Sequence, residues 1–161
     1  MTRKPYADRS DLEKLASCWN KARGFASREE WSAVIIRAAT SAEIATNIAV
    51  RSELELTRKL EKVFVDSLLR WANGLDGKMN KLLLPLPTTK EKKGTFKKLH
   101  TKSKKINMKR NEVAHSGHFM NDAEATEVLK ASSEFIDTLV GLYHPNYSVN
   151  YAADQLKKSN I

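Results

Sequence analysis

The chain has 161 residues, of which 28 are Lys or Arg and 19 are Asp or Glu, so its formal net charge is +9 at pH 7. With 41% apolar and 29% charged residues, the composition is typical of a globular protein and argues against disordered, collagen-like and membrane classes. The length suits a single domain spanning 1–161, and the single cysteine, Cys18, excludes a disulfide within the chain.

The first residues of the chain give no sign of secretion, because Arg3 and Lys4 are followed by no apolar stretch. No segment approaches the roughly 18 apolar residues that a membrane-spanning helix needs. We therefore expect a cytoplasmic protein that has no membrane as a partner.

Helices are expected throughout, because the chain holds only six glycines and four prolines and shows no strand-like alternation. The first helix is predicted from about Ser10 to Arg23, where Gly24 follows. Ser27 and Glu30 have the spacing of a capping box and predict the start of the next helix. From there to position 73, either one very long helix or two consecutive helices fit the pattern.

The second half of the chain is predicted to hold a loop, two helices and a tail. Prolines and a glycine between positions 85 and 94 predict the loop, and a helix is expected from Thr95 until Gly117 ends it. Asn121 and Glu124 form a capping box for the last helix. The sequence thus predicts an all-α, four-to-five-helix bundle with its core in about 10–143, a basic segment at 88–110 and a polar tail at 144–161.

The excess positive charge is confined to one stretch. Ten of the 28 basic residues lie between Lys90 and Arg110, where Glu91 is the only acid, so the rest of the chain has 18 basic and 18 acidic residues. Such a local excess indicates a polyanion-binding surface, with a solvated loop as the alternative. We predict RNA as the partner, bound by six lysines: Lys97, Lys98, Lys102, Lys104, Lys105 and Lys109.

The basic segment ends in the sequence Arg110-Asn111-Glu112-Val113-Ala114-His115. Asn111, His115 and His118 recur at helical spacing and are expected on one face of the helix. Arg110 falls on the apolar stripe of the same helix and is expected to face the core, where its charge needs a partner. Arg110 and His115 are five residues apart, about 140° around a helix, so they converge only through a bend, an unwound turn or a second copy of the chain.

This pattern, Arg110-Asn111-x-x-x-His115, resembles the Arg-x(4–6)-His signature of the HEPN superfamily. The resemblance covers a helical bundle over about 27–143, and only the six residues of the motif are specific. It implies a HEPN-like bundle that acts as a metal-independent endoribonuclease without a cofactor. It also implies a homodimer, or a pair with a related subunit, in which two motifs line one cleft.

The resemblance implies that Arg110, Asn111 and His115 are the catalytic residues. Histidine as a residue type has an unperturbed pKa near 6.5 and can move protons at neutral pH while the RNA 2′-hydroxyl attacks phosphorus, which leaves a 2′,3′-cyclic phosphate. An arginine stabilises the charge on the phosphorane oxygens, and Asn111 orients the histidine or the phosphate. Such an enzyme is expected to be a toxin-like or antiviral defence effector with an antitoxin or another regulatory partner.

Three further polar residues are given supporting roles: Glu43, Asn47 and His118. Glu43 and Asn47 lie one helical turn apart among alanines and are expected to brace Arg110. No metal site is expected, because His115 and His118 have no further ligands nearby in the sequence.

Two other functions fit the same composition. The first is a catalytically silent, HEPN-like bundle that binds RNA or DNA through the basic strip Lys90–Lys109, as a subunit of a larger assembly. The second is a protein-interaction scaffold whose lysines only confer solubility.

Overall fold

The computed structural model describes residues 4–158, and over that range the chain is all α-helical, with no strand. Seven α-helices, a 3-10 turn and two π-helical segments follow in the order η1 (Tyr6–Asp8), α1 (Asp11–Ala26), α2 (Trp31–Arg51), η2 (Ser52–Thr57), α3 (Lys62–Trp71), α4 (Gly74–Gly77), η3 (Lys78–Leu83), α5 (Lys90–Ser116), α6 (Asp122–Gly141) and α7 (Val149–Lys158). The all-α class is confirmed. The four or five predicted helices become seven in the described residues, partly because the region before 88 breaks into short helices. The ends of the predicted domain, 1–3 and 159–161, lie outside the described residues.

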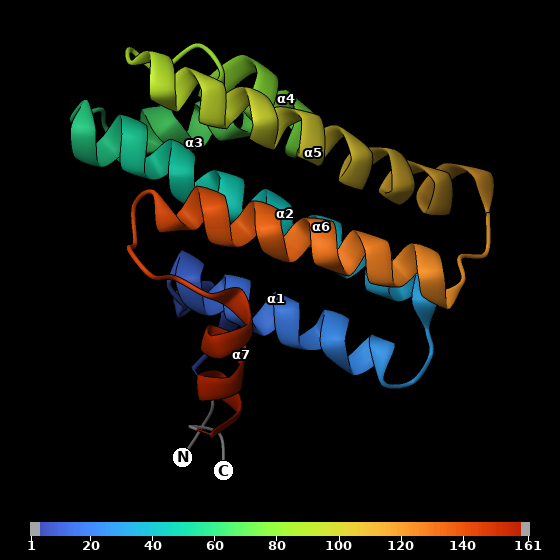
Figure 1. The fold of residues 1–161 in the computed structure, drawn as a ribbon. Helices are drawn as coiled ribbons and strands as arrows, with labels where there is room; N and C mark the ends of the chain where they lie inside the picture. The colour runs from blue at the N-terminus through green and yellow to red at the C-terminus, as the bar shows by residue number, and fades with distance from the viewer. Residues whose placement is uncertain (1–3, 159–161) are drawn as a thin grey trace.

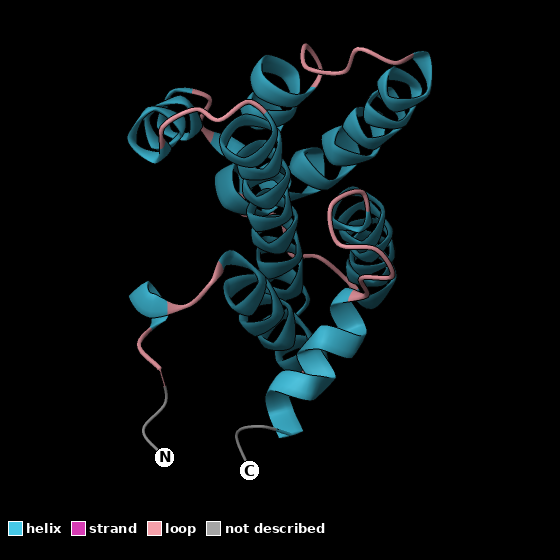
Figure 2. Cartoon of the chain, turned by 90° about the vertical axis from the view of Figure 1, so that its left-hand side faces the viewer, coloured by secondary structure: helices cyan, strands magenta, loops and turns pink. Residues whose placement is uncertain are grey.

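The long helices stack around α2, which contacts α1, α5 and α6. Figure 1 shows α5 along one edge of the bundle, α2 and α6 in the middle and α1 on the opposite side, with α7 packed across α1. Figure 2 shows the same helices from the end of the bundle, joined by loops. Five alanines are among the buried residues of α2 and let its neighbours approach closely: Ala38, Ala39, Ala42, Ala45 and Ala49.

The region from 27 to 73 forms two consecutive long helical stretches, of which the first is α2 together with η2. By length and composition alone, the stretch Trp31–Thr57 is long and apolar enough to cross a membrane. This differs from the expectation above that no segment is apolar enough to do so. Most of the apolar surface of this stretch is buried inside the bundle. Packing against α1, α5 and α6 therefore accounts for its composition.

The first two helix boundaries differ from the prediction. α1 continues past Gly24 to Ala26, and the Ser27 hydroxyl donates to the Gly24 carbonyl at 2.8 Å. Ser27 therefore caps the end of α1 rather than the start of α2, and the predicted capping box with Glu30 is wrong. α2 begins at Trp31 without a side-chain cap, because burial of its apolar face supplies the stability instead.

The last boundaries agree with the prediction, and the polar tail docks. The Asn121 side chain accepts from the Glu124 backbone N–H while the Glu124 carboxylate accepts from Asn121, as a capping box requires. In the tail, α7 buries Val149, and the indole N–H of Trp19 donates to Asn150 Oδ1 at 2.8 Å. These contacts attach α7 to α1.

A buried carboxylate holds the end of α2 to the beginning of α5. The Glu53 side chain is only 5% exposed, in the π-helical turn η2. It accepts hydrogen bonds from Lys92, from Arg58 Nη1 at 2.7 Å and from the Tyr143 hydroxyl at 2.8 Å. Burial alone would raise the pKa of Glu53, but the hydrogen bonds from Lys92, Tyr143 and Arg58 outweigh burial and lower it. The contact with Lys92 sets the antiparallel register of α2 and α5.

A second ion-pair cluster, around Arg51, joins α1, α2 and α3. The guanidinium lies 3.3 Å from Asp11, 2.7 Å from Glu55 and 2.7 Å from Asp66. Hydrogen bonds from Lys62 and Arg51 lower the pKa of Asp66 from 3.8 to about 2. Because the folded-state pKa of Asp66 is below its unfolded value, Asp66 stabilises the fold above the unfolded pKa.

This stabilisation is expected to be lost as the pH falls from about 4 towards 2, through the folded-state pKa of Asp66. Thermal unfolding followed by circular dichroism between pH 5 and pH 2 tests whether the stabilisation by Asp66 decreases as the pH falls. Asp66→Asn should have a lower melting temperature than the wild type at pH 5, and this difference should shrink as the pH approaches 2. A difference that stays constant over this window would contradict the assignment.

Candidate nucleic-acid interface

The basic segment and the motif lie on one unbroken helix, α5. The helix starts one turn before the predicted Thr95, because the Thr89 side chain accepts from the backbone N–H of Lys92 and caps it. Gly94 is therefore inside the helix and not in a loop. Gly117 ends the helix in the left-handed conformation, with φ of 62°, as predicted. An unbroken helix arranges the lysines in rows along its surface.

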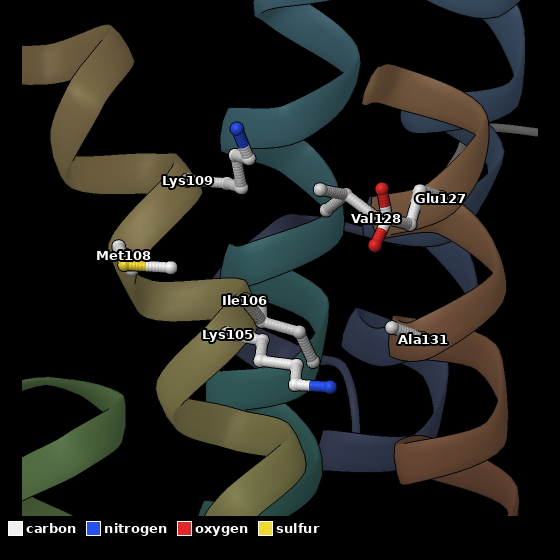
Figure 3. Close-up of a pocket in the computed structure, with 7 residues that line it drawn as sticks. All are labelled: Lys105, Ile106, Met108, Lys109, Glu127, Val128 and Ala131. Carbon is white, nitrogen blue, oxygen red and sulfur yellow. The ribbon is translucent and has the colours of Figure 1, made fainter. Parts of the chain in front are cut away.

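One row of lysines, the inner row, lines a groove between α5 and α6 and consists of Lys98, Lys102, Lys105 and Lys109. Figure 3 shows the part of the groove nearest the motif, which has a volume of about 240 Å³. Its apolar lining comes from Ile106 and Met108 of α5 and from Val128 and Ala131 of α6. Glu127 of α6 lies across the groove from the lysines.

Carboxylates neutralise two lysines of the inner row. Lys102 Nζ lies 2.5 Å from Glu134, and Lys109 Nζ lies 3.3 Å from both Glu124 and Glu112. The hydrogen bonds to Glu124 and Glu112 raise the pKa of Lys109. Lys102 and Lys109, two of the predicted RNA contacts, thus hold α5 against α6, and the acids of α6 would repel a polyanion in the groove.

A second row, the outer row, consists of Lys93, Lys97 and Lys104. At 100° per residue these three lysines fall within an arc of about 40° on α5. All three are exposed, and no carboxylate of residues 4–158 forms an ion pair with them. Asn111 and His115 fall within the same arc. The outer row therefore leads along one face of α5 to the motif.

Four of the six lysines predicted to contact RNA are exposed and without an ion pair in the described part of the chain: Lys97, Lys98, Lys104 and Lys105. Lys93 is exposed and without an ion pair there as well, but the loop predicted at Gly94 leaves it out of the six lysines chosen from the sequence. Thr89 is the signal in the sequence that predicts a helix through Lys93, because threonine is a favoured N-cap residue and α5 begins directly after it.

Arg110 does not face the core, so the predicted core position is wrong. Its side chain is exposed, and Nη1 donates to Asn111 Oδ1 at 3.1 Å. Ile106 is the last buried residue of α5. Beyond Ile106 the stripe is only partly covered: Val113 still packs against the core, whereas Arg110 is exposed and needs no buried partner.

Asn111 and His115 share one face of α5, as predicted, and His115 is exposed. The predicted place of His118 on this face is wrong, because α5 ends at Ser116 and His118 lies in the loop that follows. α5 stays helical through Ser116, so Arg110 lies about 140° around the helix from His115. No unwound turn occurs between them. The Arg110 side chain does bend round in part, because its guanidinium reaches Asn111, on the same face as His115.

Two exposed apolar side chains flank the motif. Met108 is 56% exposed, and Phe119, in the loop that follows α5, is 92% exposed. Between them in the sequence, the His118 side chain is half-exposed, with Nε2 3.9 Å from Glu124. Among the described residues, no three His, Cys, Asp or Glu side chains are grouped so that they could hold a metal ion.

Glu43 and Asn47 do not brace Arg110. Glu43 accepts from Lys78 Nζ at 2.6 Å, and the Asn47 Oδ1 atom is buried without a hydrogen-bond partner in the described structure. The register set by Glu53 and Lys92 places Glu43 opposite position 102 of α5, about 12 Å along the helix from Arg110. Glu43 instead belongs to the packing of α2 against η3.

The comparisons with known proteins add no assignment: no family model, curated protein or solved structure matches the chain.

Proposed function

We propose that the protein is a metal-independent endoribonuclease of the HEPN type, with its active site at the end of α5. The observation that carries the proposal is the exposed His115 at the end of the outer row, with the half-buried Asn111 one helical turn before it and Arg110 as the adjacent residue. A histidine open to solvent at the end of a line of unpaired lysines is suited to a phosphodiester substrate.

In the proposed reaction, His115 takes the proton of an RNA 2′-hydroxyl as its oxygen attacks the adjacent phosphorus. The bond from phosphorus to the 5′-oxygen of the next nucleotide breaks, and that oxygen takes up a proton from water while His115 later returns its own proton to solvent. The products are a 2′,3′-cyclic phosphate and a 5′-hydroxyl. Arg110 stabilises the charge on the phosphorane oxygens, and Asn111 holds the guanidinium through its amide oxygen.

A second copy of the chain, or a related subunit, completes the proposed site. Arg110 and His115 leave α5 at positions about 140° apart, so in the proposed pair the arginine of one chain meets the histidine of the other. The exposed Met108 and Phe119 beside the motif supply apolar surface for such a contact. A cytoplasmic, toxin-like or antiviral role with a restraining partner remains part of the proposal through the family resemblance.

The test is cleavage of RNA by the purified protein in EDTA. We expect cleavage by the wild type, and about 10²- to 10⁴-fold slower cleavage by His115→Ala and Arg110→Ala. His144→Ala and Arg70→Ala, which remove an exposed histidine and an exposed arginine elsewhere, are the matched controls and should cleave as the wild type does. Full activity in His115→Ala, or a strict need for a metal ion, would rule out this mechanism.

A non-catalytic nucleic-acid-binding bundle is the second candidate. It is favoured by the positions of Arg110 and His115 about 140° apart around α5, because no hydrogen bond joins their side chains in the described structure. In that case the wild type binds RNA or DNA and leaves it intact, and His115→Ala binds equally well.

A further inference from the structure

The two lysine rows of α5 face different surroundings, although the sequence presents them as one basic segment. The inner row faces Glu124, Glu127 and Glu134 of α6 across the groove. The outer row faces solvent and has no ion pair within residues 4–158. Lys98 and Lys105 of the inner row are also unpaired in the described residues, but they line the groove beside Glu127 and Glu134. A polyanion that approaches α5 therefore meets a row of lysines without neighbouring groove carboxylates on the outer side.

The outer row has the length of an extended binding site. From Lys93 to His115 is 22 residues, or about 33 Å at 1.5 Å per residue. A nucleic-acid strand with its bases stacked advances about 3.4 Å per nucleotide, so this distance corresponds to about ten nucleotides. α5 lies at the edge of the bundle (Figure 1), and its outer row lines neither groove against α6.

We propose that Lys93, Lys97 and Lys104 form a track for the phosphodiester backbone of an RNA strand about ten nucleotides long, which delivers the strand to His115. This inference rests on the proposed function for the role of His115, but the binding track itself does not need catalysis. The inner row contributes little to binding, because the acids of α6 already neutralise part of it. The site size thus follows from the length of α5.

Binding is best measured by fluorescence anisotropy with a labelled twelve-nucleotide RNA whose 2′-hydroxyls are all methylated, so that no cleavage occurs. We expect the triple variant Lys93→Gln, Lys97→Gln, Lys104→Gln to bind this probe about 100-fold more weakly at 0.1 M salt, because three phosphate contacts are lost. The slope of log affinity against log salt should decrease in magnitude by about 2.

Two control variants separate the track from net charge. A triple variant at exposed lysines on other parts of the surface, Lys21→Gln, Lys59→Gln and Lys157→Gln, loses the same charge and should bind within about threefold of the wild type. The inner-row variant Lys102→Gln, Lys109→Gln should also bind within about threefold. Circular dichroism confirms that all three variants are folded. Equal losses in the outer-row and control variants, or a larger loss in the inner-row variant, would overturn the track.

A probe of four nucleotides tests the site size. The wild type should bind the twelve-nucleotide probe at least about tenfold more tightly than the four-nucleotide probe, and the outer-row variant should lose most of this difference. If the wild type shows this binding pattern but cleaves no RNA, the proposed ribonuclease activity is wrong and the proposed binding track still holds. If His115→Ala abolishes cleavage but the outer-row variant binds RNA as the wild type does, the binding track is wrong and the proposed ribonuclease activity still holds.

Discussion

Mixed dimers that combine one Arg110→Ala chain with one His115→Ala chain are expected to recover about half of the wild-type ribonuclease activity. In a symmetric pair, each site would take its arginine from one chain and its histidine from the other. A mixed dimer then holds one site with both residues intact and one site with neither. Each variant alone should be about 10²- to 10⁴-fold slower than the wild type, so the recovery is large against this background.

The measurement uses two different affinity tags, co-expression of the two variants and purification through both tags. Analytical ultracentrifugation establishes whether the wild type and the mixed species are dimers. A mixed dimer of two His115→Ala chains with different tags controls for effects of the tags and should stay inactive. If mixed dimers of Arg110→Ala and His115→Ala are equally inactive, both residues act within one chain and the paired site is wrong.

Glu53→Ala is expected to lower the free energy of unfolding by about 3 kcal/mol. The carboxylate is 5% exposed and accepts from Lys92, Arg58 and Tyr143, so its removal leaves two cations and a hydroxyl without their partner. Removing one partner of a buried pair commonly costs about 3–5 kcal/mol. We expect the lower end of this range, because Lys92 and Arg58 are each about a third exposed and can turn towards water.

Urea unfolding followed by circular dichroism measures this loss. Glu134→Ala is the matched control, because it also removes a carboxylate from an ion pair with a lysine of α5, but its side chain is 45% exposed. Glu134→Ala should lower the free energy of unfolding by less than about 1 kcal/mol. Equal costs for Glu53→Ala and Glu134→Ala would mean that burial of the Glu53 network adds nothing to stability.

Local patterns were enough to predict the end of α5 and the start of α6, but not the helix α7 in the polar tail. Asn121 and Glu124 form the predicted capping box, and Gly117 has the positive φ that favours glycine. The prediction failed at Ser27 and Gly94, where two local signals competed. A serine can cap either end of a helix, and a glycine inside a helix costs only about 1 kcal/mol, which the remainder of α5 compensates.

The candidate site could be identified in part from the sequence. The spacing of Asn111 and His115 places them on one face of any helix, and this holds in α5. The prediction that Arg110 faces the core was wrong, because helical periodicity gives the direction of a side chain but not whether another helix lies in that direction. The pairing of Glu43 with Lys78 depends on the packing of α2 against η3 and has no local signal.

The sequence by itself determined the all-α class, the location of the excess charge between Lys90 and Arg110, and the helical arrangement of that charge from Thr95 onwards. These are local properties, because composition, capping and periodicity act within a few turns of chain. Only the tertiary structure decided which lysines remain unneutralised. The acids that pair with Lys92, Lys102 and Lys109 come mainly from η2 and α6, and packing alone brings them to α5. The net charge of +9 is therefore a property of one segment of the sequence. Which of its lysines form the unpaired outer row that leads to His115 depends on how the helices pack.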